Sequence, residues 1–331
     1  MRVEQLRGGV VEAWHEVHVA VVDGTGRLVA HTGDPELTTF WRSAAKPFQA
    51  MPLVDDGVVE RFRLTDEDLA LACASHSSEA GQVSKVREFL AKVGCAERDL
   101  LCGPHPPLSE RVAQDYQARG VRLTPVYSNC SGKHAGMLAL ARYHDWPTEF
   151  YTRPEHPVQQ RCLAEVSRWT GVPQDSIRTG VDGCGVVCFA LPLRNMALAY
   201  AKMGRGEKGE VRDGIAALPS PFSPIVQAML HHPGLIAGEG RPCTELMRAH
   251  PGRIIAKVGA EGVYCAVLVG EGLGVALKVA DGHALASALA MAAVLEALGL
   301  RPLPPSLGAR PNLNTRGEPV GELRVNGGLE E

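Results

Sequence analysis

Aromatic residues are scarce in this sequence, and no part of it is continuously apolar over a long stretch. Phe, Trp and Tyr together make up 5% of the 331 residues. No apolar run approaches the roughly 20 residues that a membrane-spanning helix needs, so we expect no membrane insertion. The first residues, Met1-Arg2-Val3-Glu4-Gln5-Leu6-Arg7, carry charges and no apolar core. We therefore expect no signal peptide and a cytoplasmic location.

The chain also lacks an excess of charge of either sign. Its 34 basic and 37 acidic residues are mixed along the sequence and give a net charge of -3. Such a balance offers no electrostatic basis for binding nucleic acid or an anionic membrane. The nine cysteines are odd in number and scattered from Cys73 to Cys265. We expect no disulfide framework, and most of these cysteines should be small buried side chains.

What the chain does have is enough apolar residues for a large core, since 45% are hydrophobic. Residue patterns predict strands near both ends of the chain, at 15–22, 27–30, 253–257, 263–269, 274–279 and 321–325. Helical patterns fill most of the middle, and a further helix is expected at 283–298. The terminal segments can share one antiparallel sheet with helices packed on it, which is an α+β fold. We treat 1–331 as a single domain, with β-rich ends (1–40 and 250–331) and a helical, glycine-loop middle (41–249).

The segment Ser43-Ala44-Ala45-Lys46 combines a hydroxyl group and an amine on one side of a helical turn. A serine hydroxyl is a weak nucleophile until a base removes its proton, and a lysine with a lowered pKa can be that base. Penicillin-recognising serine enzymes use the same Ser-x-x-Lys spacing. The spacing is also common on ordinary solvated helices, and Pro47 disfavours regular helix at Lys46. We expect helix from here to about Leu53.

Two other segments could supply a second hydroxyl and a second amine. Ser75-His76-Ser77-Ser78-Glu79 is either a capped turn or a site at which Ser75 transfers a proton or attacks. Lys257-Val258-Gly259-Ala260-Glu261-Gly262 places a lysine at the end of an expected strand. This arrangement is similar to the Lys-Thr-Gly element of serine β-lactamases, although an isolated Lys-x-Gly is a weak signal.

Two glycine-bearing loops place thiols beside charged residues. Asn129-Cys130-Ser131-Gly132-Lys133-His134-Ala135-Gly136 reads as a loop that leads into a helix, and Asp182-Gly183-Cys184-Gly185 as a flexible turn. Cys130 and Cys184 could share one metal ion with a nitrogen donor, a set that suits zinc. Spacing alone favours His134 as that donor. The alternative is a glycine-rich helix start with a buried cysteine.

Taken together, the segments resemble the type II L-asparaginase family of the rhizobial kind. The matching motifs are Arg42-Ser43-Ala44-Ala45-Lys46-Pro47-Phe48-Gln49-Ala50, Ser75–Glu79, Asn129–Gly136, Asp182–Gly185 and Lys257–Gly262. The resemblance implies a serine β-lactamase-like and glutaminase-like fold, and hydrolysis of L-asparagine to L-aspartate and ammonia by a homodimer. It also implies two Ser–Lys pairs, Ser43 with Lys46 and Ser75 with Lys257. Finally, it implies a zinc ion held by Cys130, Lys133 and Cys184.

The expected chemistry is acyl transfer, in which Ser43 attacks the side-chain amide carbon after Lys46 takes its proton. Arg42, His134 and Asp182 are candidates to bind the zwitterionic head of asparagine, a cation for its carboxylate and an anion for its ammonium group. Two alternatives stay open. One is a related acyl-serine amidohydrolase that acts on glutamine or a β-lactam. The other is a non-catalytic binding protein that zinc stabilises.

Overall fold

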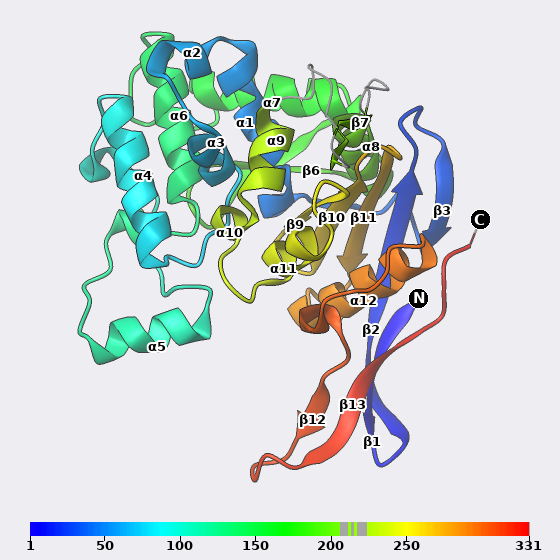
Figure 1. Ribbon diagram of the computed structural model, residues 1–331. Helices are drawn as coiled ribbons and strands as arrows, with labels where there is room; N and C mark the ends of the chain where they lie inside the picture. Colours follow the sequence, from blue (N-terminus) through cyan, green and yellow to red (C-terminus); the bar gives the residue numbers. More distant parts are fainter. Residues whose placement is uncertain (206–210, 213–214, 217–223, 331) are drawn as a thin grey trace. The chain divides into compact units, whose positions relative to one another are not determined.

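The computed structural model describes residues 1–205, 211–212, 215–216 and 224–330, shown in Figure 1. The chain forms two compact units. The first contains residues 1–44, 191–205 and 245–331, and the second contains residues 45–190 and 206–244. The expectation of one domain over 1–331 stays a prediction.

The first unit is built on an eight-stranded antiparallel sheet in the order β12-β13-β1-β2-β11-β10-β9, with β3 also paired to β2. Its strands are β1 (Arg2–Arg7), β2 (Val10–Val22), β3 (Leu28–Thr32), β9 (Ile254–Val258), β10 (Val263–Leu268), β11 (Leu273–Val279), β12 (Pro311–Leu313) and β13 (Pro319–Asn326). A short strand, β4 (Thr38–Phe40), follows the β3 segment. Because both ends of the chain contribute to one sheet, the predicted α+β arrangement is confirmed.

Two helices pack on this sheet and explain why its central strands are apolar on both faces. Helix α8 (Leu193–Gly204) packs on β2, β10 and β11, and α12 (Ala284–Ala297) packs on β1, β2, β10, β11 and β13. The approach of α8 to β11 is close. A Cβ on Gly274 would lie 2.0 Å from the carbonyl oxygen of Ala197, so only glycine fits there. Strands covered on both faces become continuous apolar runs, as in Val19-Ala20-Val21-Val22, all fully buried.

The second unit is mainly helical. Its helices are α1 (Lys46–Asp55), α2 (Val58–Phe62), α3 (Asp66–Ala72), α4 (Ala80–Lys92), α5 (Glu110–Ala118), α6 (Ser131–Tyr143), α7 (Pro157–Thr170), α9 (Pro224–His231) and α10 (Pro233–Ile236). Strand β5 (Arg178–Val181) pairs with β6 (Val187–Pro192), and β7 (Val211–Arg212) with β8 (Ile215–Ala216). Helix α11 (Pro242–Ala249) crosses the boundary between the units.

Two glycines let α6 pack tightly against α3. A Cβ on Gly132 would lie 2.2 Å from the carbonyl oxygen of Leu71, and one on Gly136 would lie 3.3 Å from Ala72 Cβ. Residues four apart share a face of a helix, so both glycines point at α3. This packing brings the first turn of α6 against the end of α3, where the Ser75 segment begins.

Some elements differ from the expectation. The predicted helix from Ser43 begins instead as a 3-10 turn, η1 (Arg42–Ala45), and regular helix starts only at Lys46. Pro47 lies in the first turn of α1, where its fixed φ suits the helix and its missing N–H is not needed. Strand β1 was not predicted from its charged sequence. Searched over the described ranges, no helix has the length and apolar character that crossing a membrane requires.

Candidate active site

Lys46 and Ser75 are hydrogen-bonded partners in the second unit. Lys46 is the first residue of α1, and its Nζ lies 2.9 Å from Ser75 Oγ and 2.5 Å from the carbonyl oxygen of Ala74. Both side chains are buried, Lys46 completely. An amine in contact with a buried hydroxyl group can take its proton once the amine is neutral. The geometry is therefore that of a serine beside its base.

Backbone and side-chain hydrogen bonds hold the loop that carries Ser75. Its backbone N–H donates to Ile236 O (2.8 Å), and that of His76 donates to Asn129 O (3.2 Å). The loop ends in a capping box that starts α4, formed by Glu79 and Gln82. The turn is thus capped, and it also presents Ser75 to Lys46.

His76 links this loop to the start of α6. Its Nδ1 accepts a hydrogen bond from the backbone N–H of Ser78 (3.1 Å), so its Nε2 carries the proton and donates to Ser131 Oγ (2.8 Å). Ser131 in turn donates to Val126 O (2.9 Å). Burial, with the positive charge of Lys46, lowers the pKa of His76 to about 3. His76 is therefore a neutral structural link in the physiological pH range.

Cys130, Lys133 and Cys184 form a second cluster in the same unit. Cys130 is the N-cap of α6, Lys133 lies in the first turn of that helix, and Cys184 lies in the turn between β5 and β6. Lys133 Nζ is 3.1 Å from Cys184 Sγ. Cys130 Sγ hydrogen-bonds to Cys184 and lies 2.8 Å from Asn129 Oδ1. The structure thus brings together three residues from two segments about fifty positions apart in the sequence.

The protonation states of this cluster follow from these contacts. The hydrogen bond from Cys130 and the charge of Lys133 outweigh burial and lower the pKa of Cys184 well below that of an ordinary thiol. The same hydrogen bond, with burial, raises the pKa of Cys130. Burial acts to lower the pKa of Lys133, but Cys184, Cys130 and Asp182 outweigh it, and the net shift is upward. The cluster is therefore a thiolate, a thiol and an ammonium group.

This donor set fits a zinc ion if the Cys130 thiol and the Lys133 ammonium group each lose a proton. Two sulfurs and one amine nitrogen would supply three ligands of a tetrahedral site, with the fourth position open. Across the described part of the chain, no group of three or more His, Cys, Asp or Glu side chains is placed to hold a metal. Lys133 would therefore have to be the third ligand, after it and Cys130 lose their protons.

His134 presents a buried hydrogen-bond donor. Its Nδ1 lies 2.6 Å from the hydroxyl of Tyr151, which accepts a hydrogen bond from the backbone N–H of Leu101 (3.0 Å). If Tyr151 donates to Nδ1, the proton of His134 lies on Nε2, and every other polar atom of the pair has a partner. The opposite tautomer would leave both the tyrosine proton and the Nε2 lone pair unpaired. His134 Nε2 is buried and has no partner among the described residues. With this tautomer, His134 Nε2 is a buried N–H donor.

Ser43 lies in the first unit, in a turn held by several contacts. Trp41 Nε1 donates to Cys265 Sγ (3.4 Å), and the hydroxyl of Tyr200 donates to the carbonyl oxygen of Ala44 (2.8 Å). Arg42, directly before Ser43, has a φ of +52°. This left-handed conformation costs a non-glycine residue about 1–2 kcal/mol, and such strain clusters at functional sites.

Lys257 lies in the same unit, on the strand beside this turn. It is fully buried, and its Nζ donates to the carbonyl oxygen of Val258 (3.0 Å). In the sheet Lys257 pairs with Cys265, the residue that anchors Trp41. A Cβ on Gly259 would lie 2.9 Å from Trp41 O, so glycine is needed where β9 ends against the Ser43 turn. The glycine noted in the sequence therefore serves close packing.

The expected site residues are divided between the two units. Arg42, Ser43 and Lys257 belong to the first, and Lys46, Ser75, Cys130, Lys133, His134, Asp182 and Cys184 to the second. Each expected Ser–Lys pair joins residues of different units, and both pairs stay predictions. Sequence reasoning missed three contacts: Lys46 with Ser75, His76 with Ser131, and His134 with Tyr151. Lys46 and Ser75 both lie in motifs that the sequence analysis identified, although their contact was not predicted. Tyr151 lies in none of these motifs.

Comparison with known proteins supports the resemblance. A profile of the L-asparaginase II family matches residues 3–325. A search of curated proteins finds no match. Among solved structures, Mglu in its native form aligns with a TM-score of 0.48 and 17% identity, over 86% of this chain. A putative β-lactamase from Bacteroides dorei aligns with a TM-score of 0.38 and 16% identity, over 86% of this chain and 88% of its own. A β-lactamase from Mycobacterium bovis gives 0.36 and 13%, over 85% and 94%.

The chain spans about 65% of the length of Mglu. The three TM-scores lie below 0.5, so these likenesses say nothing about substrate. The family profile is the decisive match, because it covers nearly the whole chain and every motif noted in the sequence. The chain belongs to the L-asparaginase II family, a family of amidohydrolases.

Proposed function

We propose that this chain hydrolyses L-asparagine to L-aspartate and ammonia through a serine–lysine acyl-enzyme mechanism. Family membership supports amide hydrolysis. The observation that supports Lys46 as the base is the 2.9 Å contact between its Nζ and Ser75 Oγ, with both side chains buried. The choice of Ser43 as the nucleophile comes from the family resemblance. A buried amine beside a hydroxyl group is the arrangement that lets a lysine act as a general base.

In the proposed reaction, the Ser43 hydroxyl attacks the side-chain amide carbon and its proton passes to Lys46. The C–N bond then breaks, the nitrogen takes a proton from the lysine, and ammonia leaves. Water next attacks the β-aspartyl ester and restores Ser43. Ser75, hydrogen-bonded to Lys46, carries protons between Lys46 and a further base, for which Lys257 is the candidate.

Three residues are proposed to bind the amino-acid head of the substrate. Arg42 would pair with its carboxylate and Asp182 with its ammonium group. The unpartnered Nε2–H of His134 supports a role in donating to a substrate oxygen. A neutral donor in a buried place selects for an oxygen atom without adding charge to the site.

Zinc, a homodimer and a cytoplasmic location complete the proposal. Cys130, Lys133 and Cys184 would hold the ion. When bound, zinc would supply a positive charge that orients the substrate. The dimer rests on the family resemblance.

The test is a comparison of rates on L-asparagine, L-glutamine and a chromogenic β-lactam, with the same purified protein. The proposal expects kcat/KM to be highest for L-asparagine by at least about tenfold, since pockets that hold one methylene fewer discriminate by that much. A higher kcat/KM for glutamine or for the β-lactam would contradict the assignment of asparagine and identify that compound as the preferred substrate. Zinc binding without hydrolysis of any of the three would instead indicate a binding protein.

A further inference from the structure

A cavity of about 430 Å³ in the second unit is rich in positive charge. Four of the residues that line it are basic: Arg61, Arg63, Lys92 and Arg142. They lie at or just after the C-terminal ends of α2, α4 and α6, and α6 packs against the other two helices (Figure 1). The volume of the cavity is within the range of about 300–1,000 Å³ that is usual for small-molecule sites. A chain with a net charge of -3 thus gathers cations at one place.

Three of these four cations keep their hydrogen-bond donors available. Lys92 is the exception, because its Nζ pairs with the buried carboxylate of Asp68 (2.6 Å). Among the residues that the structure describes, the side chains of Arg61, Arg63 and Arg142 form neither an ion pair nor a hydrogen bond. All three are exposed. Guanidinium groups in this state can each offer two parallel N–H donors to an anion.

The dipoles of the helices offset only part of this charge. Basic side chains in the last turn of a helix stabilise its negative end, and Arg61, Lys92 and Arg142 lie in such turns. Each helix end carries at most about half a negative charge. Three ends therefore offset about half the charge of three unpaired arginines, so the cavity stays positive.

Arg63 occupies a position at which glycine is the usual residue. It is the C-cap of α2 and has a φ of +53°. Glycine takes this left-handed conformation without steric cost, whereas a residue with a Cβ is strained in it. The strained backbone places a third guanidinium group at the cavity.

Arg61 is held in place without losing its charge. Its Cζ lies 5.4 Å from the centroid of the Phe62 ring, which also lines the cavity. A cation–π contact orders the side chain and leaves its N–H donors available. Less side-chain entropy is then lost when an anion binds.

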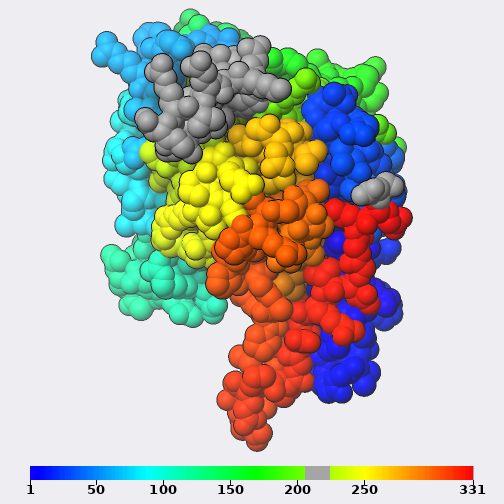
Figure 2. All heavy atoms as spheres, turned by 45° about the vertical axis from the view of Figure 1, so that its right-hand side comes forward, coloured from blue at the N-terminus to red at the C-terminus, as the bar shows by residue number. Residues whose placement is uncertain are grey.

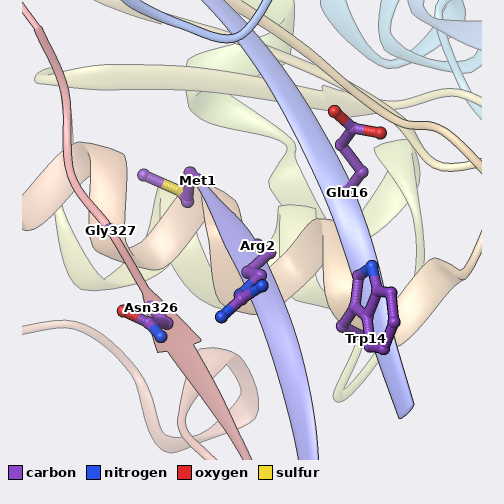
Figure 3. A pocket seen from close by; sticks show the side chains of 6 residues that line it. All are labelled: Met1, Arg2, Trp14, Glu16, Asn326 and Gly327. Carbon is purple, nitrogen blue, oxygen red and sulfur yellow. The ribbon is translucent and has the colours of Figure 1, made fainter.

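A second cavity, on the sheet of the first unit, has a lining of mixed charge. Its strands include β1 and β13, which come from opposite ends of the chain and lie side by side, as the blue and red segments of Figure 2 show. The charged residues that line it are Arg2 and Glu16 (Figure 3), and Arg2 is paired with Glu4 (2.9 Å). That cavity favours neither sign of ligand, in contrast to the cavity of the second unit.

The chemistry of three arginines matches linked phosphate groups. Arginine binds phosphate oxygens through two parallel hydrogen bonds, so three arginines use about six oxygens. A carboxylate has two oxygens in one plane. A phosphate group has three acceptor oxygens and a charge of about -1.5 to -2. Two linked phosphates therefore supply both the oxygens and the charge that this cavity can bind.

We propose that the cavity at the ends of α2, α4 and α6 binds a small anion that contains two linked phosphate groups. Inorganic pyrophosphate and the tail of a nucleoside diphosphate share this chemistry. The ligand would connect the ends of three helices, so it should also stabilise the folded chain. None of the residues that line the cavity belongs to the candidate active site.

The test is calorimetric titration of the full chain, without substrate, at about 0.15 M salt. The probes are pyrophosphate, adenosine diphosphate, phosphate and citrate. We expect pyrophosphate and adenosine diphosphate to bind at least about tenfold more tightly than phosphate or citrate, because they use more of the arginine donors. Equal affinity for the first two would identify the linked phosphates as the whole ligand. Tighter binding of adenosine diphosphate would identify a nucleotide.

Variants test whether the arginines of the cavity are responsible. Arg142→Glu and Arg63→Gly should each weaken pyrophosphate binding at least about tenfold, as for a lost hydrogen bond between charged groups. Arg63→Gly should not lower the unfolding temperature of the free chain, because glycine takes a φ of +53° without strain. Arg122→Glu is the matched control, an exposed arginine of the same unit that does not line the cavity. It should bind pyrophosphate within about twofold of wild type.

Three results would overturn the inference. They are a wild type that binds pyrophosphate with a Kd above about 1 mM, equal affinity for pyrophosphate and citrate or phosphate, and equal weakening by Arg122→Glu and Arg142→Glu. Thermal unfolding without ligand identifies any variant with a folding defect, and Arg63→Gly then provides the decisive result. None of these measurements uses catalysis, so failure of this site and failure of the asparaginase proposal are distinguished.

Discussion

Lys46 and Ser75 act on each other directly, and this contact predicts how their substitutions combine. Both Lys46→Met and Ser75→Ala should lower kcat for asparagine, each by on the order of 10² or more. Because the two groups work through one hydrogen bond of 2.9 Å, the double variant should be little worse than the worse single variant. The measurement is a double-mutant cycle on kcat. Effects that simply multiply would show that the two residues act independently.

His134 predicts a difference between two amide substitutions. Glutamine can place an N–H near the position of Nε2, whereas asparagine reaches only that of Nδ1. His134→Asn should raise KM for asparagine by about tenfold or more, the cost of a lost hydrogen bond to a charged group, and His134→Gln should raise it much less. Equal KM values for the two variants would contradict the assigned tautomer.

The pH dependence of KM offers a further check on His134. Burial, opposed only in part by Cys130 and Asp182, lowers its pKa to about 3. A group with so low a pKa stays neutral at every pH above about 4, so it contributes no step to KM between pH 5 and 8. A step in KM near pH 6.5 that disappears in His134→Gln would show that His134 titrates normally and is accessible to solvent.

At the scale of elements, α3 packs against α6. This contact places the Ser75 loop, which follows α3, beside the start of α6, which carries Cys130 and Lys133. Gly132→Ala would force a Cβ to within 2.2 Å of Leu71 O, and we expect a loss of about 2–3 kcal/mol in the free energy of unfolding. Gly81→Ala is the matched control in α4, where nothing lies within 4 Å of the added Cβ. It should be neutral or stabilise by up to about 1 kcal/mol. Denaturant unfolding of both variants makes the comparison, and equal stabilities would contradict this packing.

Most elements could be predicted from residue patterns, and the failures have physical causes. Strands such as β10 and β11 are continuous apolar runs between glycine turns, and α12 is long and alanine-rich. Strand β1 was not predicted because the charged residues Arg2, Glu4 and Arg7 interrupt the alternation of apolar and polar residues. Glu4 is buried there only because Arg2 and Arg324 neutralise it, and Arg324 lies more than 300 positions away. The turn at Arg42 was not predicted because no sequence pattern indicates a positive φ at an arginine.

At the scale of the whole molecule, the sequence motifs identify the segments expected to form the site, but they do not predict all of the contacts between those segments. The resemblance to a family supplied the cluster of Cys130, Lys133 and Cys184, whereas spacing alone favoured His134 in place of Lys133. In the structure, Nδ1 of His134 lies beside the hydroxyl of Tyr151 and the amine of Lys133 lies 3.1 Å from Cys184, and these contacts support Lys133 as the proposed ligand. Contacts of this kind depend on how α3, α6 and the β5–β6 turn pack, which no local pattern encodes.

Metal content and its pH dependence test the cluster. We expect about one zinc per chain in wild type, and loss of zinc in Cys130→Ala and Cys184→Ala. Cys130 and Lys133 have raised pKa values and both must lose a proton to bind the ion. Affinity should therefore rise about 100-fold per pH unit as pH increases through neutrality, and fall as steeply on acidification. Elemental analysis and competition with a chelator measure both quantities. Wild type free of metal after growth in ample zinc would leave the two cysteines as ordinary buried thiols.

The most direct test of the central claim is release of ammonia from L-asparagine by purified wild type and Ser43→Ala. If Ser43 forms the acyl-enzyme, wild type hydrolyses asparagine, and the variant loses on the order of 10³ or more in kcat while its unfolding temperature is unchanged. Activity of Ser43→Ala within tenfold of wild type would contradict the assignment of Ser43 as the nucleophile.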